Sequence, residues 1–137
     1  MTGLDERIAT EALALVGVPF RLHGHAVETG LDCVGLALLA ARRAGAAVKP
    51  PPGYHLRGMT GARAMRFLAG AGLLSVSSAL PGNLLLTRTG PMQLHIMILT
   101  AQGLVHAHAG LRRVVLMPCP SPWPVLGQWR FSSEGSD

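Results

Sequence analysis

The chain has 137 residues, of which 49% are hydrophobic and only 4% are aromatic, which predicts a single domain over residues 1–137 with an aliphatic core. The formal net charge is +5, but the cationic residues are scattered and few aromatic residues accompany them, which argues against nucleic-acid binding. No apolar run reaches the roughly 18 residues of a membrane-spanning helix, and the first residues are not typical of a secretory leader, so we expect neither a span nor export by that route.

The carboxylates and cysteines exclude two further classes. None of the seven carboxylates lies between Cys33 and Ser133. A glycosidase of the usual kind needs two carboxyl groups beside the scissile bond, and both would have to precede Cys33. Cys33 and Cys119 are the two cysteines, and one pair in a chain of this length is no disulfide framework. We therefore expect two reduced thiols and no glycosidase.

The first part of the chain has the hydrophobic period of helices, interrupted by polar or proline-rich loops. The expected helices span 4–16, 33–44 and 60–73, and the expected loops span 23–30 and 49–55. Asp32 is a favourable cap at the start of the second helix, and Gly45 is a favourable stop at its end. The three prolines at 50–52 lack amide donors, which predicts a surface loop there.

After residue 82 the pattern changes to short apolar runs separated by turn signals. The expected strands span 83–87, 94–100, 104–107, 113–116 and 129–131. The polar tail, 132–137, is expected to fray. Helices followed by strands with short connections predict an α+β domain, in which N-terminal helices pack on a central antiparallel sheet.

Cys33 is the first residue of the second expected helix. There the unpaired amides and the helix dipole favour a thiolate, while the neighbouring carboxylate of Asp32 opposes it, so the direction of the net pKa shift stays open. Cys33 is accordingly a candidate nucleophile. The alternative is a small buried hydrophobic residue.

Two histidines are candidate partners of this thiol. His95 lies in an otherwise apolar strand, where burying an imidazole is unfavourable unless the ring has a partner. A hairpin between the strands would bring His95 and His106 side by side as cross-strand neighbours. A thiol, a base and a group that orients the base would then lie in sequence. Because no Asp or Glu lies between Cys33 and Ser133, the orienting group must be neutral or a histidine. His108 shares a strand face with His106 and is the alternative for that role.

The sequence also allows a metal-binding module. His23 with His25, and His106 with His108, form two His-x-His pairs that could each place two imidazole nitrogens around zinc. The spacing is not a recognised structural-zinc pattern, and zinc would compete with catalysis for the thiolate of Cys33. We expect the enzyme itself to need no metal and no other cofactor.

Five segments together resemble the NlpC-type cell-wall cysteine peptidases, which are papain-like in fold. The family motifs are written G-x-P-Y-x-W/H, D-C-S-G-L, P-G-D-V/L-x-x-F, H-V-G-I-Y-L and F-I/V-H-A. The similar segments here are 15–21, 30–36, 80–86, 94–99 and 104–107. Their order over residues 15–109 is more specific than any single motif. Departures from the family are Phe20 in place of tyrosine, Val34 in place of serine and Asn83 in place of aspartate.

The resemblance implies a papain-like NlpC-type domain that hydrolyses an amide bond in peptidoglycan stem peptides, typically between D-glutamate and diaminopimelate. It makes Cys33 the nucleophile, His95 the general base and then acid, and His106 the orienting residue. The oxyanion would be held by the backbone amide of Cys33. The other candidate residues for substrate or oxyanion contact are Phe20, His23, Asp32 and His108.

The short chain and its ending, from Ser121 to Phe131, look most like the branch of this family in phage tails and gene transfer particles. That resemblance implies a virion-like tail location after synthesis in the bacterial cytoplasm, with bacterial peptidoglycan as substrate and other tail or baseplate proteins as partners. A structural tail subunit with weak or no peptidase activity is the alternative. The mean hydropathy of +0.36 and the proline-rich segments suit packing against other proteins.

Overall fold

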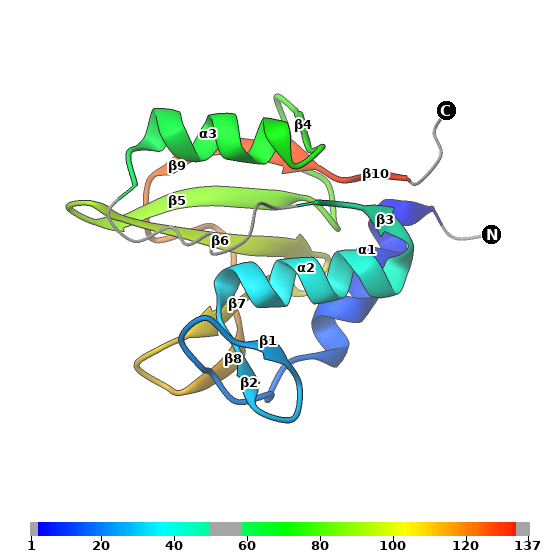
Figure 1. Ribbon diagram of the computed structural model, residues 1–137, viewed down its shortest axis with the longest axis vertical. Helices are drawn as coiled ribbons and strands as arrows, with labels where there is room; N and C mark the ends of the chain where they lie inside the picture. The colour runs from blue at the N-terminus through cyan, green and yellow to red at the C-terminus, as the bar shows by residue number, and fades with distance from the viewer. Residues whose placement is uncertain (1–2, 50–58, 134–137) are drawn as a thin grey trace.

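The computed structural model of the protein describes residues 3–49 and 59–133 (Figure 1). Its helices are α1 (Leu4–Ala14), α2 (Cys33–Ala44) and α3 (Gly61–Gly70). Its strands are β1 (His25–Ala26), β2 (Gly30–Leu31), β3 (Ala46–Ala47), β4 (Leu74–Ser75), β5 (Leu84–Gly90), β6 (Gln93–Thr100), β7 (Gly103–His108), β8 (Arg113–Met117), β9 (Val125–Arg130) and β10 (Ser132–Ser133). No helix in these two ranges is long and apolar enough to cross a membrane.

The centre of the molecule is a six-stranded sheet in the order β4-β9-β5-β6-β7-β8, in which all neighbours are antiparallel. Figure 1 shows α3 along the β9 and β5 side and α2 along β6 and β7. The buried side chains of all three helices join one hydrophobic cluster with one face of the sheet. The predicted α+β class, with helices packed on an antiparallel sheet, is therefore confirmed.

Alternation along the strands divides the apolar side chains between two faces. The side chains facing the helices include Leu84, Leu86, Ile96, Ile98, Val105 and Ala107. The intervening Leu85, Met97 and Leu104 form a second, smaller cluster, against which Trp123 packs from the connection between β8 and β9. The face opposite the helices is thus partly covered by a segment without regular structure.

Several expected boundaries need correction. The first helix ends at Ala14 and not at residue 16, because Leu15 and Val16 donate to carbonyls three residues back and Gly17 takes a left-handed φ of +97°. The last long strand begins at Val125 and not at residue 129. The third helix is shorter than expected, spanning Gly61–Gly70.

Three short pairings were not predicted, and one of them is that of β4 with β9 at the edge of the central sheet. The expected 23–30 loop contains β1, which pairs with β2, and Ser132–Ser133 at the start of the expected frayed tail pair with β3. Residues 134–137 lie outside the described residues. So does the expected 49–55 loop, apart from Lys49.

Asp32 fixes the start of α2, as the sequence predicts, and also ties it to the preceding loop. Its Oδ1 accepts the Gly35 amide at 2.7 Å, and its Oδ2 accepts the His23 amide at 3.0 Å. His23 takes a left-handed φ of +61°. A single carboxylate therefore holds together the helix that begins with Cys33 and the loop that carries His23.

The strands β6 and β7 run together over only part of their length. They pair from Thr100–Gly103 to Ile98–Val105 and no further, although β6 remains paired with β5 and β7 with β8 beyond that point. The Ile96 amide, just past the last pair, lies against the sulfur of Cys33. The strands therefore part where the N-terminus of α2 reaches the sheet.

Gly35 allows the first turn of α2 to approach the preceding loop. A Cβ at this position would overlap the backbone carbonyl of Gly24. We expect Gly35→Ala to lower the free energy of unfolding by about 1–3 kcal/mol, because backbone must move to admit the methyl group. Chemical denaturation measures this loss. Gly70→Ala in α3 is the matched control, since a Cβ there meets nothing within 4 Å; equal effects of the two substitutions would contradict the packing argument.

Candidate active site

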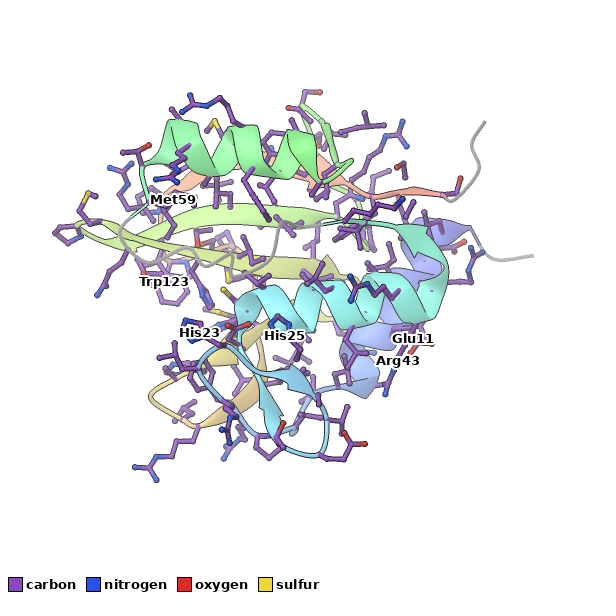
Figure 2. All side chains as sticks on the ribbon, in the orientation of Figure 1. Glu11, His23, His25, Arg43, Met59 and Trp123 are labelled. Carbon is purple, nitrogen blue, oxygen red and sulfur yellow. The ribbon has the colours of Figure 1, made fainter. Side chains whose placement is uncertain are left out.

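One cavity of about 590 Å³ lies at the N-terminal end of α2. Its lining includes all seven site residues expected from the sequence: Phe20, His23, Asp32, Cys33, His95, His106 and His108. Figure 2 shows His23 and Trp123, which also lines the cavity, near this end of the helix. The fold thus gathers residues from the 20–23 loop, α2, β6 and β7.

Cys33 is half-buried at the start of α2 and uncharged. Burial raises the pKa of its thiol to about 12, and the Asp32 carboxylate adds to that rise. The backbone amides of Ile96, Val34 and Cys33 itself act in the opposite direction and lower the pKa. The question left open by the sequence is therefore settled against a resting thiolate, because desolvation outweighs the amides at the helix start.

The rings of His95 and His106 are joined by a hydrogen bond between His95 Nε2 and His106 Nδ1, 2.9 Å apart. Their centroids are 5.0 Å apart and their planes lie at 83°. The sequence predicted that these two residues would lie directly opposite each other, but they are diagonal neighbours. Continuing the β6–β7 register would place Met97 opposite His106. The bond leaves Nδ1 of His95 as the nitrogen available to another group.

Both rings are kept neutral by their surroundings. Burial lowers the pKa of His95 to about 3, with smaller contributions from His106 and His108. Burial also lowers the pKa of His106 to about 4, with His108 contributing. If Nδ1 of His95 is to accept a proton, its Nε2 must carry the hydrogen and donate it to Nδ1 of His106. His106 then keeps its own hydrogen on Nε2.

His108 has a different partner. Its Nδ1 accepts the Leu111 amide at 3.1 Å, and its ring centroid lies 5.6 Å from that of His106. Of the two histidines between which the sequence left a choice, only His106 is hydrogen-bonded to His95. His108 contributes to the cavity wall and to the local electrostatics.

Phe20 and Asp32 are held mainly through backbone contacts. The Phe20 amide donates to the carbonyl of Arg112 at 2.9 Å, and the residue bridges Leu31 as an isolated parallel pair. Both carboxylate oxygens of Asp32 already accept backbone amides. Asp32 therefore positions the loop and the helix, while Phe20 adds an apolar ring to the cavity.

The two His-x-His pairs differ in where they lie, and both His106 and His108 line the cavity. His23 lines the cavity but His25 does not, and within residues 3–49 and 59–133 no three His, Cys, Asp or Glu side chains are grouped to hold a metal ion. Cys119 is exposed, and neither cysteine is in a disulfide, as expected.

No motif in the sequence marks Trp123 as a site residue. It lies between β8 and β9, and its ring is edge-on to the rings of both His95 and His106. A tryptophan between two prolines in a chain with few aromatic residues was the available signal. Nothing local connects it to His106 and His95, which lie 17 and 28 residues earlier in the chain.

Substitution of His106 tests whether its Nδ1 orients His95 by accepting a hydrogen bond from that ring. We expect His106→Ala to lower kcat/KM by about 10²-fold, because His95 loses the partner that fixes its tautomer. His106→Asn offers an oxygen near the position of Nδ1 and should retain most of the activity. Steady-state hydrolysis of a synthetic stem peptide measures both. Equal losses in the two variants would contradict this role.

Comparison with known proteins places the fold. No protein-family model and no curated protein matches the sequence. Among solved structures, NlpC2 from Trichomonas vaginalis has a TM-score of 0.69 at 18% identity, covering 96% of this chain and 49% of that one. The P60 domain of antigen MAP1204 from M. avium subspecies paratuberculosis has a TM-score of 0.64 at 19% identity, covering 93% of each chain.

A third structure is the NlpC/p60 domain of the peptidoglycan hydrolase SagA. It has a TM-score of 0.53 at 25% identity, covering 83% of this chain and 88% of that one. The chain spans less than half the length of the two Trichomonas structures that it resembles. These likenesses cover nearly all of the helices and strands described above. The chain has the NlpC/P60 fold, as its sequence motifs predict.

Proposed function

We propose that the protein is a cysteine peptidase that hydrolyses an amide bond in peptidoglycan stem peptides. One observation carries the proposal: a cysteine at a helix N-terminus shares a cavity with an imidazole that is hydrogen-bonded, at 2.9 Å, to a second imidazole. The fold adds support, since SagA and RipB, which have similar structures, are named as peptidoglycan hydrolases. The proposed nucleophile is Cys33, and the proposed base is His95.

The reaction would begin with both groups uncharged. As the sulfur of Cys33 attacks the amide carbonyl carbon, its proton passes to Nδ1 of His95, which then holds two N–H groups. His106 accepts the Nε2–H of that imidazolium and so stabilises its charge. The tetrahedral oxyanion would be held by the Cys33 backbone amide, which points out of the first turn of α2.

Collapse of the tetrahedral intermediate breaks the carbon–nitrogen bond. His95 returns the proton to the departing amine, which leaves a thioester on Cys33. His95 then removes a proton from water, and the resulting hydroxide attacks the thioester carbonyl carbon. The products are a carboxylic acid, an amine and the free thiol, so one water is consumed for each amide bond cleaved.

We propose the bond between D-glutamate and diaminopimelate as the scissile bond. The resemblance of residues 30–36 and 94–99 to family motifs supports this choice. Digestion of purified sacculi, followed by mass analysis of the soluble fragments, tests it. Fragments should carry a free amino group on diaminopimelate and a new carboxyl group on D-glutamate.

The control for this digest is protein whose Cys33 thiol has been alkylated beforehand, which should release nothing. Release of sugar fragments with new reducing ends would show glycan cleavage and contradict the proposal. Absence of any fragment from the untreated protein would contradict it as well. Cleavage at another amide of the stem peptide would agree with the proposed peptidase activity and would change only the scissile bond.

We further propose that the protein acts from the tail of a phage-like or gene transfer particle. The resemblance of the chain ending to that branch supports this, and so do large apolar side chains on the surface, among them Leu80, Leu22 and Met92 at 61%, 59% and 56% exposed. Such side chains suit contacts with other tail or baseplate proteins. Mass spectrometry of purified particles should detect the protein, and its absence there would contradict the location.

A structural tail subunit is the second candidate, favoured by the same exposed side chains. Particle assembly in cells that carry the Cys33→Ala variant separates the two roles. Normal particles with no stem-peptide cleavage indicate an enzyme in the tail. Normal particles with unchanged cleavage would remove Cys33 from the reaction.

A further inference from the structure

The connection between β8 and β9 crosses the face of the sheet that is opposite the helices. Trp123 is half-buried there and packs against the small cluster of Leu85, Met97 and Leu104. His95 is two residues from Met97 in β6, and His106 is two residues from Leu104 in β7, so both imidazoles lie on the face of this cluster. This segment therefore lies over the pair of imidazoles and not over the side of the sheet that bears Cys33.

The indole of Trp123 contacts both imidazoles in similar geometry. Its ring centroid lies 6.3 Å from that of His95 and 5.9 Å from that of His106, with interplanar angles of 83° and 84°. The two imidazoles are themselves at 83° to each other. Edge-to-face contacts of this kind fix ring orientation as well as burying surface. The three rings therefore constrain one another.

Trp123 is held in place by more than its packing. The Ser121 hydroxyl donates to the Trp123 carbonyl at 2.8 Å and accepts the Trp123 amide at 3.1 Å. Both bonds close the turn Ser121–Pro122–Trp123 on itself. The indole thus reaches the cavity wall from a turn that two hydrogen bonds hold closed.

We propose that Trp123 is a positioning residue, which shields the His95–His106 hydrogen bond from bulk water and fixes the orientation of both rings. It touches the imidazoles and acts through them. The inference rests on the proposed thiol–imidazole site but not on its substrate, because the rings can be observed without any reaction.

The electrostatics of the site agree with such a shield. Burial is the largest cause of the low pKa of His95 and of His106, and an indole over both rings removes water without adding a charge. The titratable groups that line the same cavity are Asp32 and Cys33 at the start of α2, His23 in the preceding loop, and His108 on β7. No titratable residue of the β8–β9 connection lines the cavity, since Cys119 lies outside it.

The test measures the ring titrations by NMR in protein without substrate, on a Cys119→Ser background that leaves Cys33 as the one thiol. In Trp123→Ala we expect the pKa of His95 and of His106 to rise by about 1–2 units, because water reaches the rings. Trp123→Phe retains an aromatic ring and most of the burial, so it should show less than half of that rise. Ser121→Ala, which removes both bonds of the turn but no ring, should give an intermediate rise.

A second readout is the pH dependence of kcat/KM on a stem peptide, whose acid limb should move upward with the ring pKa. Unchanged ring titrations in folded Trp123→Ala would overturn the proposal, as would equal shifts in Trp123→Ala and Trp123→Phe. If Trp123→Ala does not fold, the same criteria apply to Trp123→Phe and Ser121→Ala: no shift in either overturns it. Shifted titrations in a protein that cleaves no peptide would support the shield while contradicting the proposed function.

Discussion

Stem-peptide release by the Cys33→Ala variant should fall by about 10⁴-fold or more, because only binding and the oxyanion amides remain when the nucleophile is removed. Cys33→Ser should be almost as inactive. Burial already raises the pKa of the thiol to about 12, and a hydroxyl in the same place would be harder still to deprotonate. The fold should survive both changes within about 1 kcal/mol, since Cys33 is only half-buried.

The measurement is the rate of fragment release from purified sacculi, together with the unfolding transition of each variant. Cys119→Ser is the matched control, because this second thiol is exposed and lies outside the cavity. It should keep full activity. Fragment release by Cys33→Ala at a rate near that of the unaltered protein would mean that the thiol takes no part in the chemistry.

Replacement of the proposed base should lower activity almost as much. We expect His95→Gln to lose about 10³-fold in kcat/KM, because the thiol of Cys33 then has no group to receive its proton. Glutamine is close in size, and the contact from Thr87 Oγ1 is to the backbone carbonyl of residue 95 at 3.0 Å, so the strand should keep its place. An unfolding transition near that of the unaltered protein would confirm that the loss is chemical.

The pH dependence of the unaltered protein gives an independent check on His95. The pKa of this imidazole is lowered from 6.5 to about 3, so the ring stays unprotonated as the pH falls from about 7 to about 5. kcat/KM should therefore stay nearly constant over that range and decline only in stronger acid. An acid limb near the ordinary imidazole value would show that His95 is not the base or is not buried during catalysis.

Local signals predicted the parts of the fold on which the site depends. The bounds of α2 agree with expectation because its two ends are set by neighbouring residues, the Asp32 cap and the left-handed Gly45. The strands β5 to β8 were predicted from apolar runs between turns, whereas β4 and the first part of β9 were not. Two-residue pairings such as β1 with β2 escaped prediction, since so short a strand has no period to recognise.

Tertiary contacts decided what the sequence left open. The direction of the Cys33 pKa depends on burial, which a motif does not encode, and the diagonal placement of His95 and His106 depends on where two strands stop pairing. Trp123 reaches the histidines across the sheet from a proline-rich turn. Motifs therefore identified the candidate residues, which the structure brings into one cavity, while packing determined their charge state and their neighbours.

The early end of the β6–β7 ladder has one more consequence. It leaves a seam in the sheet, where the sulfur of Cys33 on the helix side and the imidazoles on the opposite face line one cavity although each stays in its own layer. The length of this hairpin then sets how the imidazoles lie relative to Cys33. An insertion of two residues in both strands would preserve the inward and outward alternation of side chains, yet it would move the seam along α2 and separate the imidazoles from Cys33.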